Sequence, residues 1–224
     1  MDVLVIGNRE DPERGYVGDA LADRGATFRE VWRGDLMTED LPAGTPDVVL
    51  VLGSEWHVYD PEVRPAVERE IRFLRQAAAQ EVPVLGICFG AQVLARAFGG
   101  DVRHDPGGGE VGWYTVDSDD PALPEGPYVQ WHSDVFSVPP GAVELARSPV
   151  GPQAFALGSA FAVQFHPEVT PQILHRWAVG GHATISRWGL DRERLLAEAD
   201  ERAEASRGHA EALVEAFLAG EFRR

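Results

Sequence analysis

Residues 84–92 read Val-Leu-Gly-Ile-Cys-Phe-Gly-Ala-Gln, an apolar run that changes into a helical pattern around Cys88, the single cysteine of the chain. Gly86 and Gly90 stand two positions on either side of it and permit the close backbone approach that a sharp strand-to-helix turn requires. Such a nucleophile elbow lifts the cysteine clear of a sheet and places its sulfur near a helix N-terminus, which favours the reactive thiolate. The alternative is a buried cysteine that acts as a small apolar side chain.

A second motif lies further along the chain, where residues 161–168 read Phe-Ala-Val-Gln-Phe-His-Pro-Glu. Its apolar half predicts a buried strand, which Pro167 ends because proline has no N–H to donate. His166 and Glu168 are two residues apart, so on extended chain both project to the same side. The carboxylate can orient one imidazole nitrogen and leave the other free to take a proton from a thiol. With the elbow, this pair predicts a nucleophile, a base and an orienting acid at strand ends.

In these two segments the chain resembles the class I, or triad-type, glutamine amidotransferases. Gly-Ile-Cys-Phe-Gly-Ala-Gln matches the nucleophile segment of that family, and Phe-His-Pro-Glu matches its second catalytic segment. The resemblance covers roughly residues 1–180 and is greatest to stand-alone proteins similar to the amidotransferase domain of GMP synthetase. It implies that Cys88 is the nucleophile, that His166 is the general base and then the general acid, and that Glu168 orients the histidine.

The resemblance also implies an oxyanion hole. Residues 48–55 read as a buried strand ending in glycine, where the amide of Gly53 would be one donor and the amide of Phe89 the other. The family usually begins this loop with Gly-Gly or Gly-Gly-Pro, whereas this chain has Leu-Gly-Ser at residues 52–54, so the choice of donor between Gly53 and Ser54 stays open. Because a misdirected amide would leave the hole incomplete, we expect the isolated protein to hydrolyse glutamine slowly.

Residues 129–134, Val-Gln-Trp-His-Ser-Asp, resemble the family loop that holds the α-amino and α-carboxylate groups of glutamine. Backbone groups of Ser133 and Asp134, with the side chain of Gln92, would then contact the substrate. The Asp134 carboxylate faces the substrate ammonium group in one interpretation and is a turn residue in the other. His132 is interpreted as structural. The histidines outside these motifs, His57 and His104 among them, are interpreted as surface or packing residues, and neither a metal site nor a cofactor is expected.

Composition limits the classes of function. A formal charge of −16 argues against nucleic acid or an anionic membrane as a partner, because phosphate binding needs basic patches. All 20 basic residues are arginine, which excludes Schiff-base and P-loop chemistry by lysine. A single cysteine suits a reducing compartment, and the chain shows neither a basic leader nor an apolar run near the length of a membrane span. We therefore expect a cytoplasmic protein.

Strand-like and helix-like segments alternate, which predicts an α/β fold with a mostly parallel twisted sheet covered by helices on both faces. Short segments split by proline and glycine between residues 102 and 163 predict a small antiparallel annex. Residues 1–180 are expected to form the amidotransferase-like domain. Residues 181–224 are expected to form a helical C-terminal extension packed on it and broken into two helices at Ser206-Arg207-Gly208.

These patterns favour a thiol hydrolase that attacks the γ-amide of glutamine, forms a γ-glutamyl thioester and releases glutamate and ammonia. A γ-glutamyl hydrolase would apply the same chemistry to γ-glutamyl amines or peptides, and a non-catalytic regulatory protein would keep the fold alone. A thiol esterase of the α/β-hydrolase type is disfavoured, because that fold places its acid well before its histidine. The expected partners are a small-molecule substrate and, where the ammonia is used, an acceptor synthetase on a separate polypeptide.

Overall fold

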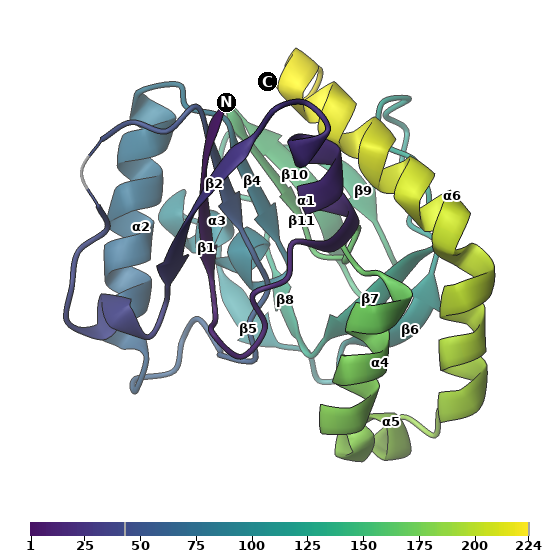
Figure 1. The fold of residues 1–224 in the computed structure, drawn as a ribbon. Helices are drawn as coiled ribbons and strands as arrows, with labels where there is room; N and C mark the ends of the chain where they lie inside the picture. The colour runs from purple at the N-terminus through teal and green to yellow at the C-terminus, as the bar shows by residue number, and fades with distance from the viewer. Residues whose placement is uncertain (43, 224) are drawn as a thin grey trace.

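The structure, a computed structural model, describes residues 1–42 and 44–223 apart from the side chain of His182. A seven-stranded sheet runs through its centre in the order β2-β1-β3-β4-β11-β10-β9 (Figure 1). The first five strands in that order are parallel, and β10 and β9 extend the sheet in antiparallel fashion. The strands are β1 (Asp2–Gly7), β2 (Thr27–Trp32), β3 (Val48–Val51), β4 (Val84–Ile87), β9 (Val143–Arg147), β10 (Pro152–Leu157) and β11 (Ala160–Val163).

Two small antiparallel sheets lie beside the main one. One pairs β5 (Val102–His104) with β8 (Asp134–Phe136), and the other pairs β6 (Glu110–Tyr114) with β7 (Tyr128–His132). The predicted α/β class is thus confirmed. The annex is smaller than the sequence pattern indicates, because β9 and β10 join the main sheet.

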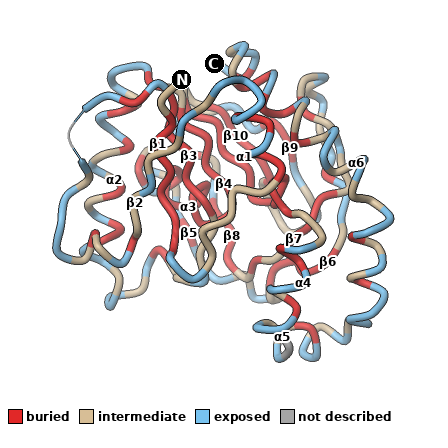
Figure 2. Tube along the Cα trace, viewed as in Figure 1, coloured by how far each residue is buried: buried red, intermediate tan, exposed pale blue. Residues whose placement is uncertain are grey.

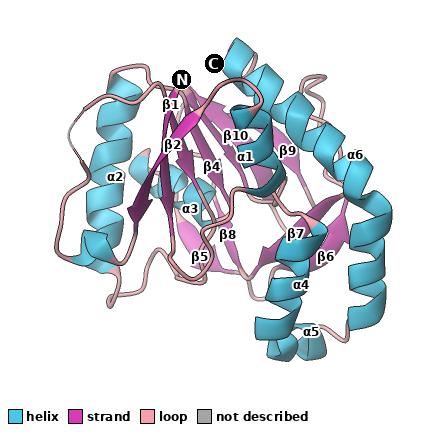
Figure 3. Ribbon diagram, in the orientation of Figure 1, coloured by secondary structure: helices cyan, strands magenta, loops and turns pink. Residues whose placement is uncertain are grey.

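Helices cover both faces of the sheet, as Figure 3 shows. On one face lie α1 (Gly15–Ala22) and the C-terminal half of α6 (Arg192–Ala219), and on the other lie α2 (Arg64–Ala79) and α3 (Phe89–Ala97). A short 3-10 helix spans Asp35–Met37. The helices α4 (Pro171–Gly180) and α5 (His182–Arg187) pack with the N-terminal half of α6 in a third cluster. No helix in the described part of the chain is long and apolar enough to cross a membrane.

The central strands are apolar along their whole length because helices cover both sides of them. In β3, Val49 and Val51 pack into the core beneath α2 and α3, whereas Leu50 packs into the core beneath α1 and α6. This alternation follows from the two-residue period of a strand. Figure 2 shows the result, a buried sheet between partly exposed helices.

The predicted break in the C-terminal extension is wrong, since α6 runs without interruption through Ser206, Arg207 and Gly208. A glycine inside a helix costs only about 1 kcal/mol relative to alanine. The buried residues Leu213, Val214 and Phe217, which follow, pack against the sheet and outweigh that cost. The division of the chain at residue 180 stays a prediction.

The parallel strands β1, β3, β4 and β11 end at a common edge of the sheet, and the segments that follow them carry the polar residues of interest. Asn8 and Asp11 follow β1, Gly53 follows β3, Cys88 follows β4, and His166 follows β11. The carboxyl edge of such a sheet is the usual place for a ligand, because the loops there converge.

Substitution of Gly90 by alanine tests the packing of this edge. A Cβ atom at Gly90 would press on the carbonyl oxygen of Val51 and lie 2.9 Å from its carbonyl carbon. We expect Gly90→Ala to lower the free energy of unfolding by about 3 kcal/mol, because backbone cannot move aside cheaply. Gly208→Ala is the control. Nothing lies within 4 Å of a Cβ atom built at Gly208, so we expect this substitution to raise the free energy of unfolding by about 0.5–1 kcal/mol. Equal effects of the two in urea denaturation would contradict the packing described.

Candidate active site

Cys88 occupies the turn between β4 and α3 with an unusual backbone. Its φ of 53° and ψ of −108° are unfavourable for a residue with a side chain, at a cost of about 1–3 kcal/mol. Hydrogen bonds on both sides hold the turn: the Cys88 N–H donates to Val163 O at 2.8 Å, and the Gln92 N–H donates to Cys88 O at 3.0 Å. Strain of this kind is concentrated at functional sites.

The two glycines of the motif permit this turn for a steric reason. A Cβ atom at Gly86 would lie 2.8 Å from the carbonyl group of Gly90, and one at Gly90 would strike Val51. The start of α3 can therefore cross directly over β4 and β3. Cys88 becomes the N-cap of α3, beside the N–H groups of the first turn, which have no acceptor within the helix.

His166 and Glu168 form a buried pair after β11. His166 Nδ1 lies 2.7 Å from Glu168 Oε1, and the two residues are 5% and 3% exposed. The backbone of His166 is fixed by its N–H, which donates to Val129 O at 2.9 Å. Among the described residues, His166 Nε2 has no hydrogen-bond partner of its own, so this nitrogen remains available for proton transfer.

The electrostatic environment of His166 favours its protonated form. Burial alone lowers the pKa of the imidazole, but the Glu168 carboxylate and the nearby Cys88 sulfur raise it well above its usual value of 6.5. Gly53 lies against the same two side chains: a Cβ atom built on it would be 3.2 Å from His166 Cε1 and 3.7 Å from Cys88 Cβ. The thiol, the imidazole and the Gly53 turn thus meet at one point.

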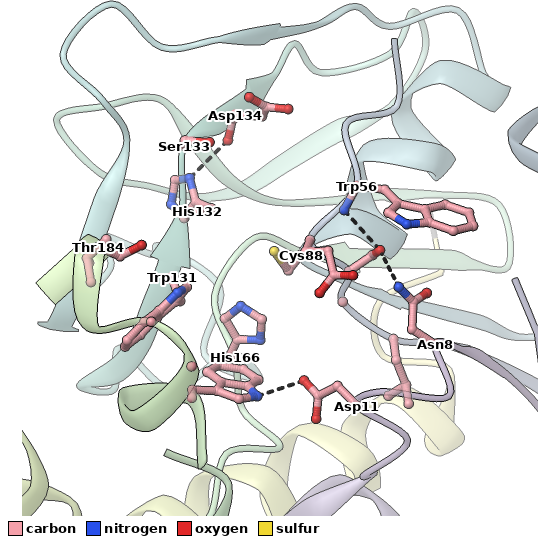
Figure 4. Close-up of a pocket in the computed structure, with 18 of the residues that line it drawn as sticks. Asn8, Asp11, Trp56, Cys88, Trp131, His132, Ser133, Asp134, His166 and Thr184 are labelled. Carbon is pink, nitrogen blue, oxygen red and sulfur yellow. Dashed lines mark hydrogen bonds between the residues drawn. The ribbon is translucent and has the colours of Figure 1, made fainter. Parts of the chain in front are cut away.

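A cavity of about 590 Å³ opens above this point (Figure 4). Of the predicted catalytic, oxyanion-hole and substrate-binding residues, all but Phe89 line it: Cys88, His166, Glu168, Gly53, Gln92, Ser133 and Asp134. Phe89 follows the cysteine as the first residue of α3, so its N–H has no helical acceptor, and its side chain is buried.

The Asp134 carboxylate already has partners. It accepts a hydrogen bond from the Tyr59 hydroxyl at 3.0 Å, and it lies 2.7 Å from His57 Nδ1 and 3.4 Å from His104 Nδ1. His57 and His104, which are interpreted from the sequence as surface or packing residues, therefore contact a residue of the cavity. His132 Nδ1 lies 2.9 Å from Asp134 O, which is a structural contact.

Gln92 is 3% exposed, and its side-chain amide already donates within the protein. Gln92 Nε2 donates to Gln164 Oε1 at 3.2 Å and to Asp134 O at 3.4 Å. The first contact ties α3 to the segment that follows β11, and the second ties it to β8. No grouping of histidine, cysteine, aspartate and glutamate in the described residues is arranged to hold a metal ion.

Tryptophans form a wall of the cavity that the sequence patterns did not reveal. Trp177 of α4 meets the His166 ring edge-on at 4.8 Å and Trp131 of β7 at 5.9 Å, and its indole N–H donates to Asp11 at 2.7 Å. Burial raises the pKa of Asp11 to about 6. Trp188, just beyond α5, also lines the cavity. The extension after residue 180 therefore contributes to the site.

A second feature missed in the sequence is a buried ion pair between Arg33 and Glu70, both 0% exposed. Glu70 stands on the apolar side of α2, between Val67 and Leu74, which are both buried. A carboxylate among the apolar positions of a predicted helix was the signal in the sequence that indicated a buried ion pair. Charged residues are almost never fully buried unless they are paired.

Comparison with known proteins identifies the family of the chain. The family described as glutamine amidotransferase class-I matches residues 17–176. A GMP synthase (glutamine-hydrolyzing) from Thermus thermophilus is 32% identical over 193 residues, which cover 79% of this chain and 36% of the relative. A γ-glutamyl-L-1-hydroxyisopropylamide hydrolase from a Pseudomonas species is 34% identical over 155 residues, 61% of this chain and 51% of the relative. The chain thus spans about a third to a half of these relatives.

Similarity to a solved structure extends over nearly the whole chain. A glutamine amidotransferase from Thermotoga maritima superposes with a TM-score of 0.86 at 27% identity, covering 97% of this chain and 98% of that one. The shared fold therefore includes the C-terminal extension. The chain belongs to the class-I glutamine amidotransferase family.

Proposed function

We propose that this protein hydrolyses the γ-amide of glutamine, or of a γ-glutamyl compound, through a thioester on Cys88. The observation that carries the proposal is the strained Cys88 at the N-terminus of α3, beside the buried His166–Glu168 pair in one cavity. A solely regulatory protein would have no use for a strained thiol and a buried, oriented imidazole at that place.

In the first step the Cys88 thiolate attacks the γ-carbonyl carbon, and the carbonyl oxygen takes the negative charge. The amides of Gly53 and Phe89 are the proposed donors to this oxyanion. The C–N bond then breaks, and the departing amine takes a proton from the His166 imidazolium. The raised pKa of His166 supports this role, because it keeps the imidazole protonated near neutral pH.

In the second step His166, now neutral, takes a proton from water, which attacks the thioester carbonyl. The C–S bond breaks, glutamate leaves, and the thiolate–imidazolium pair is restored. Glu168 keeps the ring oriented through Nδ1 in both steps. Backbone groups of Ser133 and Asp134 are proposed to hold the α-amino and α-carboxylate groups, while Gln92 positions Asp134 through its backbone oxygen.

A larger γ-glutamyl substrate is the second candidate, and the tryptophan wall favours it. The leaving amine must lie next to His166, and Trp177 borders that ring. Ammonia would occupy little of a cavity of about 590 Å³, whereas an amine with an apolar substituent would cover Trp131 and Trp177. If glutamine itself is the substrate, which is the first candidate, a separate polypeptide would accept the ammonia.

Glutamate release decides between the candidates. The purified protein is incubated with glutamine and with its γ-methyl, γ-propyl and γ-benzyl amides, and glutamate is measured by mass spectrometry. If the tryptophans receive the leaving amine, glutamine should be hydrolysed at least about a hundredfold more slowly than the preferred substituted amide, and Cys88→Ala should be inactive with all of them. Fast, saturable hydrolysis of glutamine alone would favour the first candidate. No glutamate from any of them would refute both.

The roles of His166 and Glu168 can be distinguished by the effects of their substitution on proton transfer. His166→Ala should lose more activity than Glu168→Gln, since the first removes the proton carrier and the second only its orienting charge. In Glu168→Gln, burial of His166 is no longer opposed by the carboxylate, so the pKa of His166 should fall. Hydrolysis needs the imidazolium, so the high-pH limit of kcat/KM should move to lower pH. NMR titration of His166 gives the pKa, and an unchanged value would contradict the assignment of Glu168.

A further inference from the structure

The guanidinium group of Arg33, just after β2, is fully buried and uses all five of its N–H donors. Nε and Nη2 donate to Glu70 at 3.1 and 3.3 Å, Nη1 donates to Asn8 Oδ1 at 3.1 Å, and the remaining two donate to backbone oxygens. These are Leu52 O, reached by Nη2 at 2.6 Å, and Gly53 O, reached by Nη1 at 2.9 Å. The side chain therefore holds two successive peptide groups of the turn after β3.

We propose that Arg33 is a positioning residue for oxyanion stabilisation, an inference that rests on the proposed hydrolysis. A trans peptide group is planar, with its C=O and N–H pointing in opposite directions. Fixing Leu52 O toward Arg33 therefore turns the Gly53 N–H away from Arg33, and fixing Gly53 O does the same for the Ser54 N–H. Both peptide groups are set by one rigid fork, whichever amide is the donor.

The same guanidinium also contacts the second proposed donor residue. Its central carbon lies 4.7 Å from the ring centroid of Phe89, in a cation–π arrangement. Phe89 directly follows Cys88, and its amide begins α3. One buried charge thus connects the turn after β3 with the elbow after β4, the two segments whose amides must point to a single oxygen atom.

Further contacts hold the turn from its other side. Asn8, which accepts from Arg33, donates through Nδ2 to Ser54 Oγ at 2.9 Å, and Ser54 Oγ accepts from the Trp56 N–H at 3.1 Å (Figure 4). Glu70 supplies the countercharge to Arg33. Buried ion pairs of this kind add little stability over apolar residues of similar size, so stability alone does not account for the pair.

Replacement of the pair by apolar residues tests the proposal. Arg33→Met/Glu70→Met leaves no buried charge unpaired but frees the 52–54 turn. We expect kcat for the γ-glutamyl amide hydrolysed by the wild type to fall roughly a hundredfold, with KM nearly unchanged, as when one oxyanion donor is lost. Alkylation of Cys88 by iodoacetamide passes through no oxyanion, so its rate should stay within about threefold of the wild type.

Two further variants complete the test. Arg29→Met removes a partly buried arginine of β2 that pairs with Asp2 and does not line the cavity, and it should leave kcat unchanged. Arg33→Lys keeps the charge beside Glu70 but has no planar fork to hold both carbonyls, so it should show the same loss of kcat, and it serves if the double variant does not fold.

The outcomes are distinguishable. A folded double variant, or failing that Arg33→Lys, with kcat within about threefold of the wild type would overturn the proposal. A parallel loss of kcat and of Cys88 alkylation would also overturn it, because a general disturbance of the site would then explain the result. Failure of the wild type to hydrolyse any γ-glutamyl amide is a different result and would refute the proposed function itself.

Discussion

Cys88 can hold its positive φ only because β4 and α3 meet almost without side chains between them. Gly86 and Gly90 remove the Cβ atoms that would separate the two elements, and Val51 of β3 closes against Gly90. The cost of the strained residue is offset by the surrounding apolar packing, since α3 is buried almost throughout. The turn fixes the position of the Cys88 sulfur atom, and the His166 imidazole and the Gly53 turn lie beside it in the cavity.

The cavity and the segments behind it contain several groups that are expensive to bury, and the most buried of them have hydrogen-bond partners. Glu168 is paired with His166, Arg33 with Glu70, and Asp134 lies between Tyr59 and two histidines. Such groups are positioned by their partners and not by packing alone. If Arg33 fixes the turn at residues 52–54, the isolated chain needs no partner to align its amides. Slow hydrolysis of glutamine would then reflect the size of the leaving group.

Much of the fold follows from the sequence because its signals are local. The apolar strands, their alternation with helices, and the Gly-x-Cys-x-Gly turn are each readable over ten residues or fewer. The predicted break at Gly208 failed because tertiary packing of α6 outweighs a weak local preference. The roles of Arg33 and the tryptophans were not predicted, because they do not depend on local sequence patterns. Their roles depend on partners far away in the chain, such as Glu70 for Arg33 and Asp11 for Trp177, and no short spacing reveals them.

The central claim, a common γ-glutamyl thioester on Cys88, is tested most directly by partitioning it between two nucleophiles. Hydroxylamine is added during hydrolysis of two γ-glutamyl amides with different leaving amines, and the ratio of γ-glutamyl hydroxamate to glutamate is measured for each. A thioester that forms after the amine has left predicts the same ratio for both substrates at a given hydroxylamine concentration. A ratio that changes with the leaving amine, or hydrolysis that yields no hydroxamate, would contradict the account.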